Sequence, residues 1–440
     1  MKKRIFLSII LSINILATLL TPVFAEPDNS ETTKTELVAN SESAILIDMK
    51  SGEILFSKNE HDSKSPASIT KIMTAILTLE SGLDLSDVVT ATSEAIDPIT
   101  RDHSNMGILV GEELTIENLL YGLLVDSAND AANVLAVKVG GSLDGFVQMM
   151  NDKAAELGMK NTRFKNAHGF DQEGHKTTAY DISIMARHAM QNPTFREIVK
   201  EDQYVMEATN KYKETRYLSS TNHLVSKRKQ SKYFYQKAIG IKTGYTDEAG
   251  NCLVSAAVDG QTELLAVVLK SNSEDGTAYS FVESKELLEY GFNNFEYKTI
   301  ATTGTVVSSE SVYEAKKDIC VALTPDKEIS AILPIKVNME EIKPEITLNE
   351  KFSAPIKKGD VLGSVVYTYK GKQIGTAQLI AFNDVEKDMI AAIIHLIFKT
   401  VFNPFIILII LVIGFFIFTS RNNQKKRRKN RRSRMKHVRQ

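Results

Sequence analysis

The spacing of apolar residues divides the chain into a helical middle part flanked by strands. Short apolar runs predict a β-hairpin over 44–57 and strands over 238–243, 252–258 and 263–270. Apolar residues three and four positions apart predict helices over 66–80, 115–125, 130–139, 143–157 and 178–191, and we expect the domain to end with a helix near 278–290. Because strands lie on both sides of the helices, we expect an α+β domain over 41–298 whose N- and C-terminal strands share one sheet.

A different pattern begins near Thr299. Short β runs separated by Gly, Pro and Lys occur at 305–307, 320–323, 361–367 and 377–381. This spacing predicts a separate small β-sandwich domain over 299–386.

The chain begins with a segment typical of a secretory signal peptide. Three basic residues precede an apolar run from Ile5 to Leu20, and small residues lead to Ala25. We expect a signal peptide over 1–25, a flexible polar leader over 26–40, and an extracytoplasmic location for the two predicted domains. A retained N-terminal membrane helix fits less well, because the residues before position 26 suit a signal peptidase.

The other end of the chain predicts a membrane anchor. Val401–Phe418 is apolar apart from Asn403, and about 20 such residues cross a hydrocarbon core of roughly 30 Å. We expect a membrane-proximal amphipathic segment in contact with lipid over 387–400, then a transmembrane helix over 401–420. The basic tail over 421–440 indicates a cytoplasmic C-terminus, since Lys and Arg favour that side.

Composition and charge agree with a globular chain that carries a basic tail. The 440 residues are 43% hydrophobic and 24% charged, which excludes a wholly disordered, collagen-like or polytopic membrane protein. The formal net charge of −1 hides a segregation: residues 421–440 hold eleven basic and no acidic residues, whereas residues 26–420 have a net charge of −15. A nucleic-acid-binding arm is a less economical interpretation of the tail than a topology anchor, so we expect no nucleic-acid partner.

Cysteine and histidine contribute no evident chemistry. Cys252 and Cys320 fall in different predicted domains, which favours two buried free thiols over a disulfide bridge. The eight His residues form no ligand-spaced cluster, so we expect no metal site.

The first motif with chemical potential is Ser68-Ile69-Thr70-Lys71. We expect Ser65 to cap this helix, with Pro66 at its first position. Ser68 and Lys71 are three apart and so share a helical face. A lysine with a lowered pKa can take the proton of a serine nucleophile. The alternative interpretation is an ordinary helix start with a solvated lysine. A serine three residues before a lysine also occurs at Ser226 and at Ser433, in a charged loop and in the basic tail, where we expect no catalysis.

Two further motifs strengthen this interpretation. Ser127-Ala128-Asn129 lies between two predicted helices, where it presents a hydroxyl and a carboxamide to a cleft or simply caps the next helix. Lys242-Thr243-Gly244 follows an apolar strand, where an ammonium, a hydroxyl and a backbone without Cβ suit a substrate carboxylate. The alternative interpretation of this third motif is an exposed lysine at the end of a strand, followed by a turn glycine.

The three motifs, in this order, match those of penicillin-binding proteins and class A β-lactamases, with Ala128 in place of an Asp in the second motif. Over residues 41–385, including the segment 164–170, the sequence resembles the low-molecular-mass penicillin-binding proteins, which are serine-type D-alanyl-D-alanine carboxypeptidases. The resemblance implies a penicillin-binding, β-lactamase-like transpeptidase domain, a helical cluster on an antiparallel sheet, followed by the β domain. The family commonly ends in an amphipathic helix, so the full transmembrane span is inferred from this sequence alone.

The resemblance also implies roles for nine residues. As catalytic residues, Ser68 attacks the penultimate D-Ala carbonyl, Lys71 accepts its proton, and Ser127 relays a proton to the leaving amine. The residues implied to bind substrate are Asn129, Lys242, Thr243, Gly244, Tyr245 and, at the rim of the site, His168. The N–H groups of Ser68 and Tyr245 form the implied oxyanion hole.

The expected function is therefore a membrane-anchored carboxypeptidase that trims the peptidoglycan stem pentapeptide without metal or organic cofactor. β-Lactam antibiotics are its implied covalent inhibitors. A D,D-endopeptidase and a penicillin-binding sensor without turnover are the alternatives. A class A β-lactamase fits less well, because none of the six glutamates between positions 156 and 214 is followed by Asn four residues later.

Overall fold

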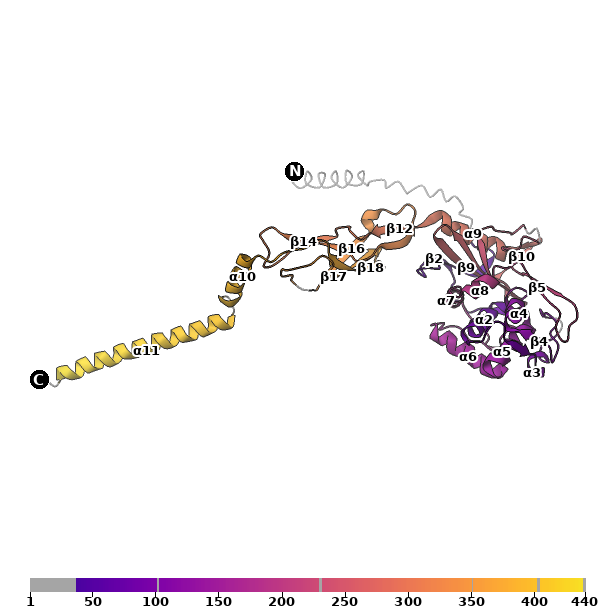
Figure 1. Cartoon of the computed structure of the whole chain (residues 1–440), viewed down its shortest axis with the longest axis horizontal. Helices are drawn as coiled ribbons and strands as arrows, with labels where there is room; N and C mark the ends of the chain where they lie inside the picture. The colour runs from indigo at the N-terminus through magenta and orange to yellow at the C-terminus, as the bar shows by residue number, and fades with distance from the viewer. Residues whose placement is uncertain (1–36, 101–102, 229–231, 350, 402–403, 438–440) are drawn as a thin grey trace, which may run out of the picture.

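The computed structural model describes residues 37–100, 103–228, 232–349, 351–401 and 404–437. The expected signal peptide and most of the expected leader lie outside these residues. The described chain is elongated (Figure 1): an α+β domain occupies one end, a β domain lies next to it, and two helices follow at the other end.

The α+β domain is built on an antiparallel sheet of order β2-β1-β9-β8-β7. Its strands are β1 (Ser41–Asp48), β2 (Ile54–Lys58), β7 (Ala238–Thr246), β8 (Gly250–Asp259) and β9 (Thr262–Ser271). β1 pairs with β9, Ile45 opposite Val267, so the N- and C-terminal strands share one sheet, as predicted. β7 forms one edge of this sheet, and it runs beyond its predicted end.

Helices cover both faces of the sheet. They are the 3₁₀ helix η1 (Ala67–Thr70) and α2 (Lys71–Glu80), α3 (Ser93–Ile96), α4 (Ile116–Leu124), α5 (Asn129–Gly140), α6 (Leu143–Glu156), α7 (Ala179–Ala189), α8 (Pro193–Ile198) and α9 (Tyr279–Asn294). Successive strand residues point to opposite faces. Ala44 and Leu46 accordingly pack with the α9 side chains, whereas Ile45 and Ile47 pack with the larger helical cluster.

Three short antiparallel pairs connect these elements. They are β3 (Val88–Thr90) with β4 (Glu113–Thr115), β5 (Gln203–Met206) with β6 (Arg216–Ser219), and β10 (Ser273–Glu274) with β11 (Thr277–Ala278). Neither these pairs nor α3 and α8 were predicted from the apolar spacing, because they are too short to show a period.

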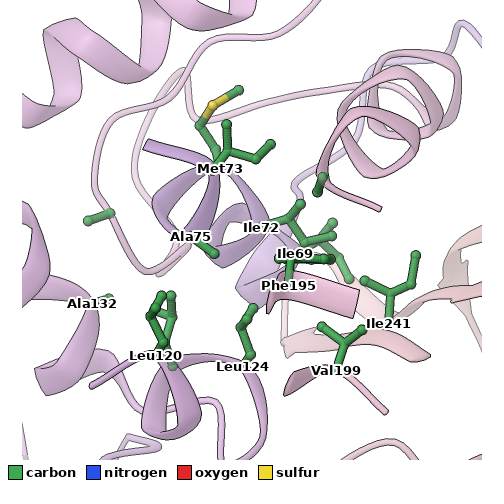
Figure 2. Packing of buried hydrophobic residues seen from close by; sticks show 14 of the residues in the cluster. Ile69, Ile72, Met73, Ala75, Leu120, Leu124, Ala132, Phe195, Val199 and Ile241 are labelled. Atoms are coloured by element: carbon green, nitrogen blue, oxygen red, sulfur yellow. The ribbon is translucent and has the colours of Figure 1, made fainter. Parts of the chain in front are cut away.

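Helix α2 lies in the centre of the helical cluster. All of its residues from Lys71 to Thr78 are buried. Ile72 and Met73 of this helix belong to one apolar cluster with side chains from α4, α8 and β7, such as Leu124, Phe195 and Ile241, and Figure 2 shows Met73 pointing away from these three. A helix enclosed on all sides has little freedom to shift. The groups at its N-terminal end are therefore held in fixed positions.

The β domain consists of two sheets that share one core. β12 (Phe295–Ala301) pairs with β15 (Ile329–Pro334), and the other sheet has the order β13 (Ser308–Ser311), β14 (Cys320–Pro325), β18 (Lys372–Ala381), β17 (Val361–Tyr369), β16 (Lys343–Leu348). A short 3₁₀ helix, η2 (Met339–Glu341), precedes β16. Leu333 of the first sheet and Leu379 of the second lie in the same apolar cluster, which is the expected sandwich arrangement.

Two details of this domain differ from expectation. Residues 305–307 are not a strand, because a turn around Gly304 (φ 105°) places the Thr305 N–H on the Thr302 carbonyl at 3.0 Å. The boundary expected between residues 298 and 299 falls inside β12. α9 ends at Asn294 and the strand starts at the next residue, so no turn sequence marks the change.

The chain ends in two helices, α10 (Met389–Val401) and α11 (Pro404–His437). By length and composition, Ile406–Arg428 of α11 can cross a membrane. Most of the large apolar side chains described in α10 and in the apolar half of α11 are exposed in the isolated chain. α11 continues as one helix into the basic tail, which the sequence pattern did not indicate.

Candidate active site

The Lys71 amine makes three hydrogen bonds at the start of α2. Its Nζ donates to Ser68 Oγ at 2.8 Å, to Asn129 Oδ1 at 2.6 Å and to the His168 carbonyl at 2.8 Å. Ser68 lies in η1, so the turn of 3₁₀ helix places these two side chains on one face. The structure thus brings a hydroxyl, an amine and a carboxamide from two of the three motifs together.

Burial changes the acidity of this amine. The Lys71 side chain is fully buried, and desolvation, followed by the positive charge of Lys242, lowers its pKa well below the usual value. The carboxylate of Asp130 opposes this shift. A lysine with so low a pKa has a larger neutral fraction, and the neutral amine accepts a proton from a hydroxyl.

Close backbone contacts fix Ser68. Ala67 adopts a left-handed conformation (φ 47°) immediately before it. A Cβ at Gly169 (φ 91°) would lie 1.8 Å from the Ala67 carbonyl oxygen, and a Cβ at Gly244 would lie 3.1 Å from the Ser68 nitrogen. Both glycines therefore allow the chain to pack directly against η1. Gly244 lies within β7, so it is not the turn glycine of the alternative interpretation.

The segment containing Gly169 is held by side chains of the core. The Thr74 hydroxyl donates to the Ala167 carbonyl at 2.6 Å, and Thr70 Oγ1 contacts His175 Nε2 at 2.9 Å. His168 reaches Lys71 through its backbone carbonyl. Desolvation, with the Lys71 charge next in size, lowers the pKa of the His168 imidazole to about 3, so the ring is neutral.

The second motif connects α4 and α5. Ser127 has a left-handed backbone (φ 63°), and Ala128 is the N-cap of α5 and makes no side-chain cap. Ser127 therefore does not cap the helix, which was the alternative role. Its side chain lines a cavity of about 300 Å³ that Ser68 also lines.

The third motif lies on β7. Lys242 is buried, its Nζ donates to the Thr243 carbonyl at 3.1 Å, and desolvation lowers its pKa to about 7 despite the nearby Asp126. Thr243 Oγ1 lies 2.6 Å from Thr221 Oγ1. Thr243, Gly244 and the exposed Tyr245 line the same cavity as Ser68. The alternative of an exposed strand-end lysine is therefore wrong.

The segment before η1 differs from the expected helix cap. Pro66 is the N-cap of η1 and has no side-chain cap. Ser65 instead donates to Asp171 Oδ1 at 2.9 Å, and Thr246 at the end of β7 donates to the same oxygen at 2.9 Å. Asp171 thus joins the segment before η1 to the end of β7.

Comparisons with known proteins agree with this geometry. Residues 30–273 match a family described as D-alanyl-D-alanine carboxypeptidase, and residues 295–387 match the C-terminal domain of penicillin-binding protein 5. The chain belongs to the D-alanyl-D-alanine carboxypeptidase family. The expected family, fold class and serine-type enzyme class are thereby confirmed.

Individual relatives cover most of this carboxypeptidase. The D-alanyl-D-alanine carboxypeptidase DacF of Bacillus subtilis is 32% identical over 88% of this chain and 95% of its own length. The D-alanyl-D-alanine carboxypeptidase DacA of Escherichia coli is 30% identical over 79% of this chain and 84% of its own length. Penicillin-binding protein 5 of Haemophilus influenzae superposes with a TM-score of 0.61 at 30% identity, covering 79% of this chain and 98% of its own.

Seven residues of the carboxypeptidase cavity were not predicted. They are Ser104, Thr221, His223, Asn251, Cys252, Ser280 and Phe281. Asn251 and Cys252 lie in a segment that resembles the family but had no predicted role, the other five belong to no recognised motif, and the fold brings all seven together from separate segments. Ser104 is tied to the second motif, because its carbonyl accepts the Asn129 N–H at 2.9 Å.

The cysteines and possible metal ligands complete the description of the site. Cys252 and Cys320 are both free thiols, but only Cys252 is buried, so the expectation of a buried Cys320 is wrong. Cys320 begins β14, where its side chain points away from the core of the β domain.

Within the described part of the chain, no group of three or more His, Cys, Asp or Glu side chains is arranged to hold a metal ion.

We predict that Gly169→Ala severely reduces acylation of this carboxypeptidase by penicillin. The added methyl would collide with the Ala67 carbonyl next to the nucleophile. Gly158→Ala is the matched control: Gly158 also has positive φ (79°), but nothing lies within 4 Å of the added Cβ. Fluorescent penicillin labelling of both variants measures the effect. Equal labelling of the two would contradict the proposed role of the close contact.

Proposed function

We propose that the protein removes the terminal D-alanine from peptidoglycan stem pentapeptides through an acyl-enzyme on Ser68. The observation that carries this proposal is the 2.8 Å hydrogen bond between Lys71 Nζ and Ser68 Oγ, with the pKa of this amine lowered by burial. A base with a lowered pKa in contact with a serine hydroxyl is the arrangement that activates this nucleophile.

In acylation, the neutral Lys71 amine takes the Ser68 proton as Oγ attacks the penultimate D-Ala carbonyl. The N–H groups of Ser68 and Tyr245 stabilise the oxyanion, and the loss of one such donor typically costs about 2.7 to 4 kcal/mol of barrier. Ser127 relays the proton to the nitrogen of the terminal D-alanine as the amide bond breaks. Water then hydrolyses the Ser68 ester and releases the shortened peptide.

Binding residues orient the peptide along β7. Asn129 holds the substrate backbone through its carboxamide, and Gly244 leaves space beside Ser68. Lys242 and the Thr243 hydroxyl receive the terminal carboxylate. His168 takes part by positioning Lys71 through its carbonyl. β-Lactams place a strained amide at the same serine, so they are covalent inhibitors of this site.

The C-terminal helices anchor the enzyme to the cell membrane. α11 crosses the bilayer once, α10 contacts lipid at the outer surface, and the basic tail remains in the cytoplasm. The β domain lies between the helices and the α+β domain (Figure 1), so it holds the active site away from the bilayer and toward peptidoglycan.

We predict that Ser68→Ala abolishes both release of free D-alanine from a pentapeptide ending in D-Ala-D-Ala and covalent penicillin labelling. The hydroxyl that forms the ester is lost, so neither reaction has a nucleophile. Ser433→Ala is the matched control, because Ser433 belongs to a second copy of the same four-residue pattern in the tail. The full chain in detergent is used for both. Persistent labelling of Ser68→Ala would refute the nucleophile, and labelling of the wild type without D-alanine release would favour a sensor.

We also predict that kcat/KM falls by about tenfold per pH unit above pH 7. The Lys242 pKa is lowered to about 7, so the free enzyme loses this positive charge as the pH rises and binds the carboxylate less well. Lys242→Arg keeps the charge and should shift the fall to higher pH. Pentapeptide hydrolysis between pH 5 and 10 measures both profiles. Identical alkaline limbs in the two proteins would exclude this titration as the cause.

The anchor makes a prediction about topology. Trypsin added outside wall-stripped cells should leave an epitope at the C-terminus intact, although the tail holds eleven Lys and Arg residues. Permeabilised cells are the control, in which the epitope should be removed. Loss of the epitope from sealed cells would place the tail outside.

A further inference from the structure

A cavity of about 590 Å³ lies where the β domain meets α10. Three of its lining residues belong to the β domain and three belong to α10, and they are Tyr313, Lys351, Ser353, His395, Phe398 and Lys399. Figure 1 shows α10 at the end of the β domain that lies away from the α+β domain. The cavity is therefore separate from the one that Ser68 lines.

One carboxylate ties α10 to the β domain. Glu314 pairs with Lys387 Nζ at 2.7 Å and with His395 Nδ1 at 3.3 Å, and its carbonyl accepts the Asp388 N–H at 2.7 Å. The His395 ring also stacks on Tyr313, with centroids 5.1 Å apart and an interplanar angle of 22°. The Lys387 side chain, followed by His395, lowers the pKa of Glu314, so this carboxylate is ionised and already paired. These contacts hold the two walls of the cavity together.

Two lysines give the cavity a positive charge. Lys351 and Lys399 are exposed, and neither forms an ion pair with any residue that the structure describes. Lys351 Nζ lies 5.8 Å from the centre of the Tyr313 ring. Among the described residues that line the cavity, none is acidic, and Ser353 adds a hydroxyl. The cavity thus offers two ammonium groups and a hydroxyl donor to an anion.

The two faces of α10 set the level of the cavity relative to a bilayer. The three α10 residues in the cavity are spaced i, i+3 and i+4, so they share one face of the helix. At 3.6 residues per turn, the opposite face carries Ile390, Ile393 and Ile397, which are 70%, 55% and 53% exposed. Pro404, at the start of α11, also lines the cavity, and Ile406–Arg428 of the same helix can cross a membrane. If α11 crosses the bilayer, as the proposed anchor requires, the three isoleucines meet the acyl chains and the cavity lies at the level of the lipid headgroups.

We propose that this cavity binds the headgroup phosphate of an anionic phospholipid in the outer leaflet. Lys351, Lys399 and the Ser353 hydroxyl bind the phosphate oxygens, whereas Phe398 and Pro404 contact the start of the acyl chains. A zwitterionic phospholipid has the same phosphate but also carries a cation that the two lysines repel, so the cavity selects anionic lipids. The bound lipid joins the β domain to the bilayer and so limits the height at which the active site is held. This inference rests on the proposed membrane anchor and is independent of the chemistry at Ser68.

The test uses the fact that the chain contains no tryptophan. Phe398→Trp places a single fluorophore in the cavity of the full chain, which is held in nanodiscs of phosphatidylcholine. A minor share of this lipid is replaced by phosphatidylglycerol or phosphatidylcholine with brominated acyl chains, which quench a nearby indole. We expect brominated phosphatidylglycerol to be preferred at this site by about fivefold or more. Lipids attracted by the basic tail lie in the other leaflet, roughly 30 Å away, and do not quench this fluorophore.

Charge variants of the Phe398→Trp protein identify the source of the preference. Lys351→Ala combined with Lys399→Ala should reduce the preference to about one, whereas Lys351→Arg combined with Lys399→Arg should keep it. Lys336→Ala combined with Lys343→Ala is the matched control, because it removes two exposed lysines of the same domain that do not line the cavity. This control should keep the preference. D-alanine release should be unchanged in every variant, which shows that each one is folded.

The alternatives give different results in the same experiment. Equal quenching by the two brominated lipids overturns the inference, as does a preference that survives Lys351→Ala combined with Lys399→Ala. Loss of the preference in millimolar glycerol 3-phosphate also overturns it, because the cavity then takes a soluble phosphate ester instead of a lipid. Absence of quenching by either lipid, with D-alanine release intact, overturns the membrane anchor as well but leaves the proposed carboxypeptidase chemistry unaffected.

Discussion

Burial of two lysine amines in one site is the constraint on which the rest of this structure depends. Lys71 and Lys242 are both removed from water, and the charge of Lys242 further lowers the pKa of Lys71. Such burial is costly unless hydrogen bonds replace water. The Ser68 hydroxyl, the Asn129 carboxamide and the His168 carbonyl supply them to Lys71. The groups that compensate for burial are thus groups to which we assign catalytic, substrate-binding or positioning roles.

The fold provides the rigidity that this arrangement needs. α2 packs against apolar side chains from several helices and β7 (Figure 2), and this packing fixes the helix that begins at Lys71. Gly169 and Gly244 let two further segments pack against η1 without a side chain between them. Asp171 links the chain before η1 to the end of β7. Ser68, Lys71 and β7 are consequently held together as one preorganised unit.

Local sequence signals predicted the sheet, six of the helices and the three motifs, because these depend on period and spacing. These local signals gave wrong or missing predictions where contacts between residues far apart in the sequence determine the structure. Ser65 looked like a helix cap, but Asp171, more than a hundred residues away, accepts its hydrogen bond. The end of β7 and the boundary between the two domains were misplaced, because pairing with β8 extends β7 beyond its apolar run and pairing with β15 makes residues 295–301 one continuous strand. Thr221, His223 and Phe281 carry no motif, so only the folded chain shows them beside Thr243.

The mechanism as a whole requires Lys71 to be a base with a low pKa in the resting enzyme. The most direct measurement is an NMR titration of the protein labelled with ¹³C at the lysine ε-carbons, with Lys71→Arg used to assign the signal. The mechanism predicts that the Lys71 signal changes from the protonated to the neutral form well below the usual pH range of lysine. A Lys71 signal that titrates near 10.5, the value of a solvated lysine, would contradict it.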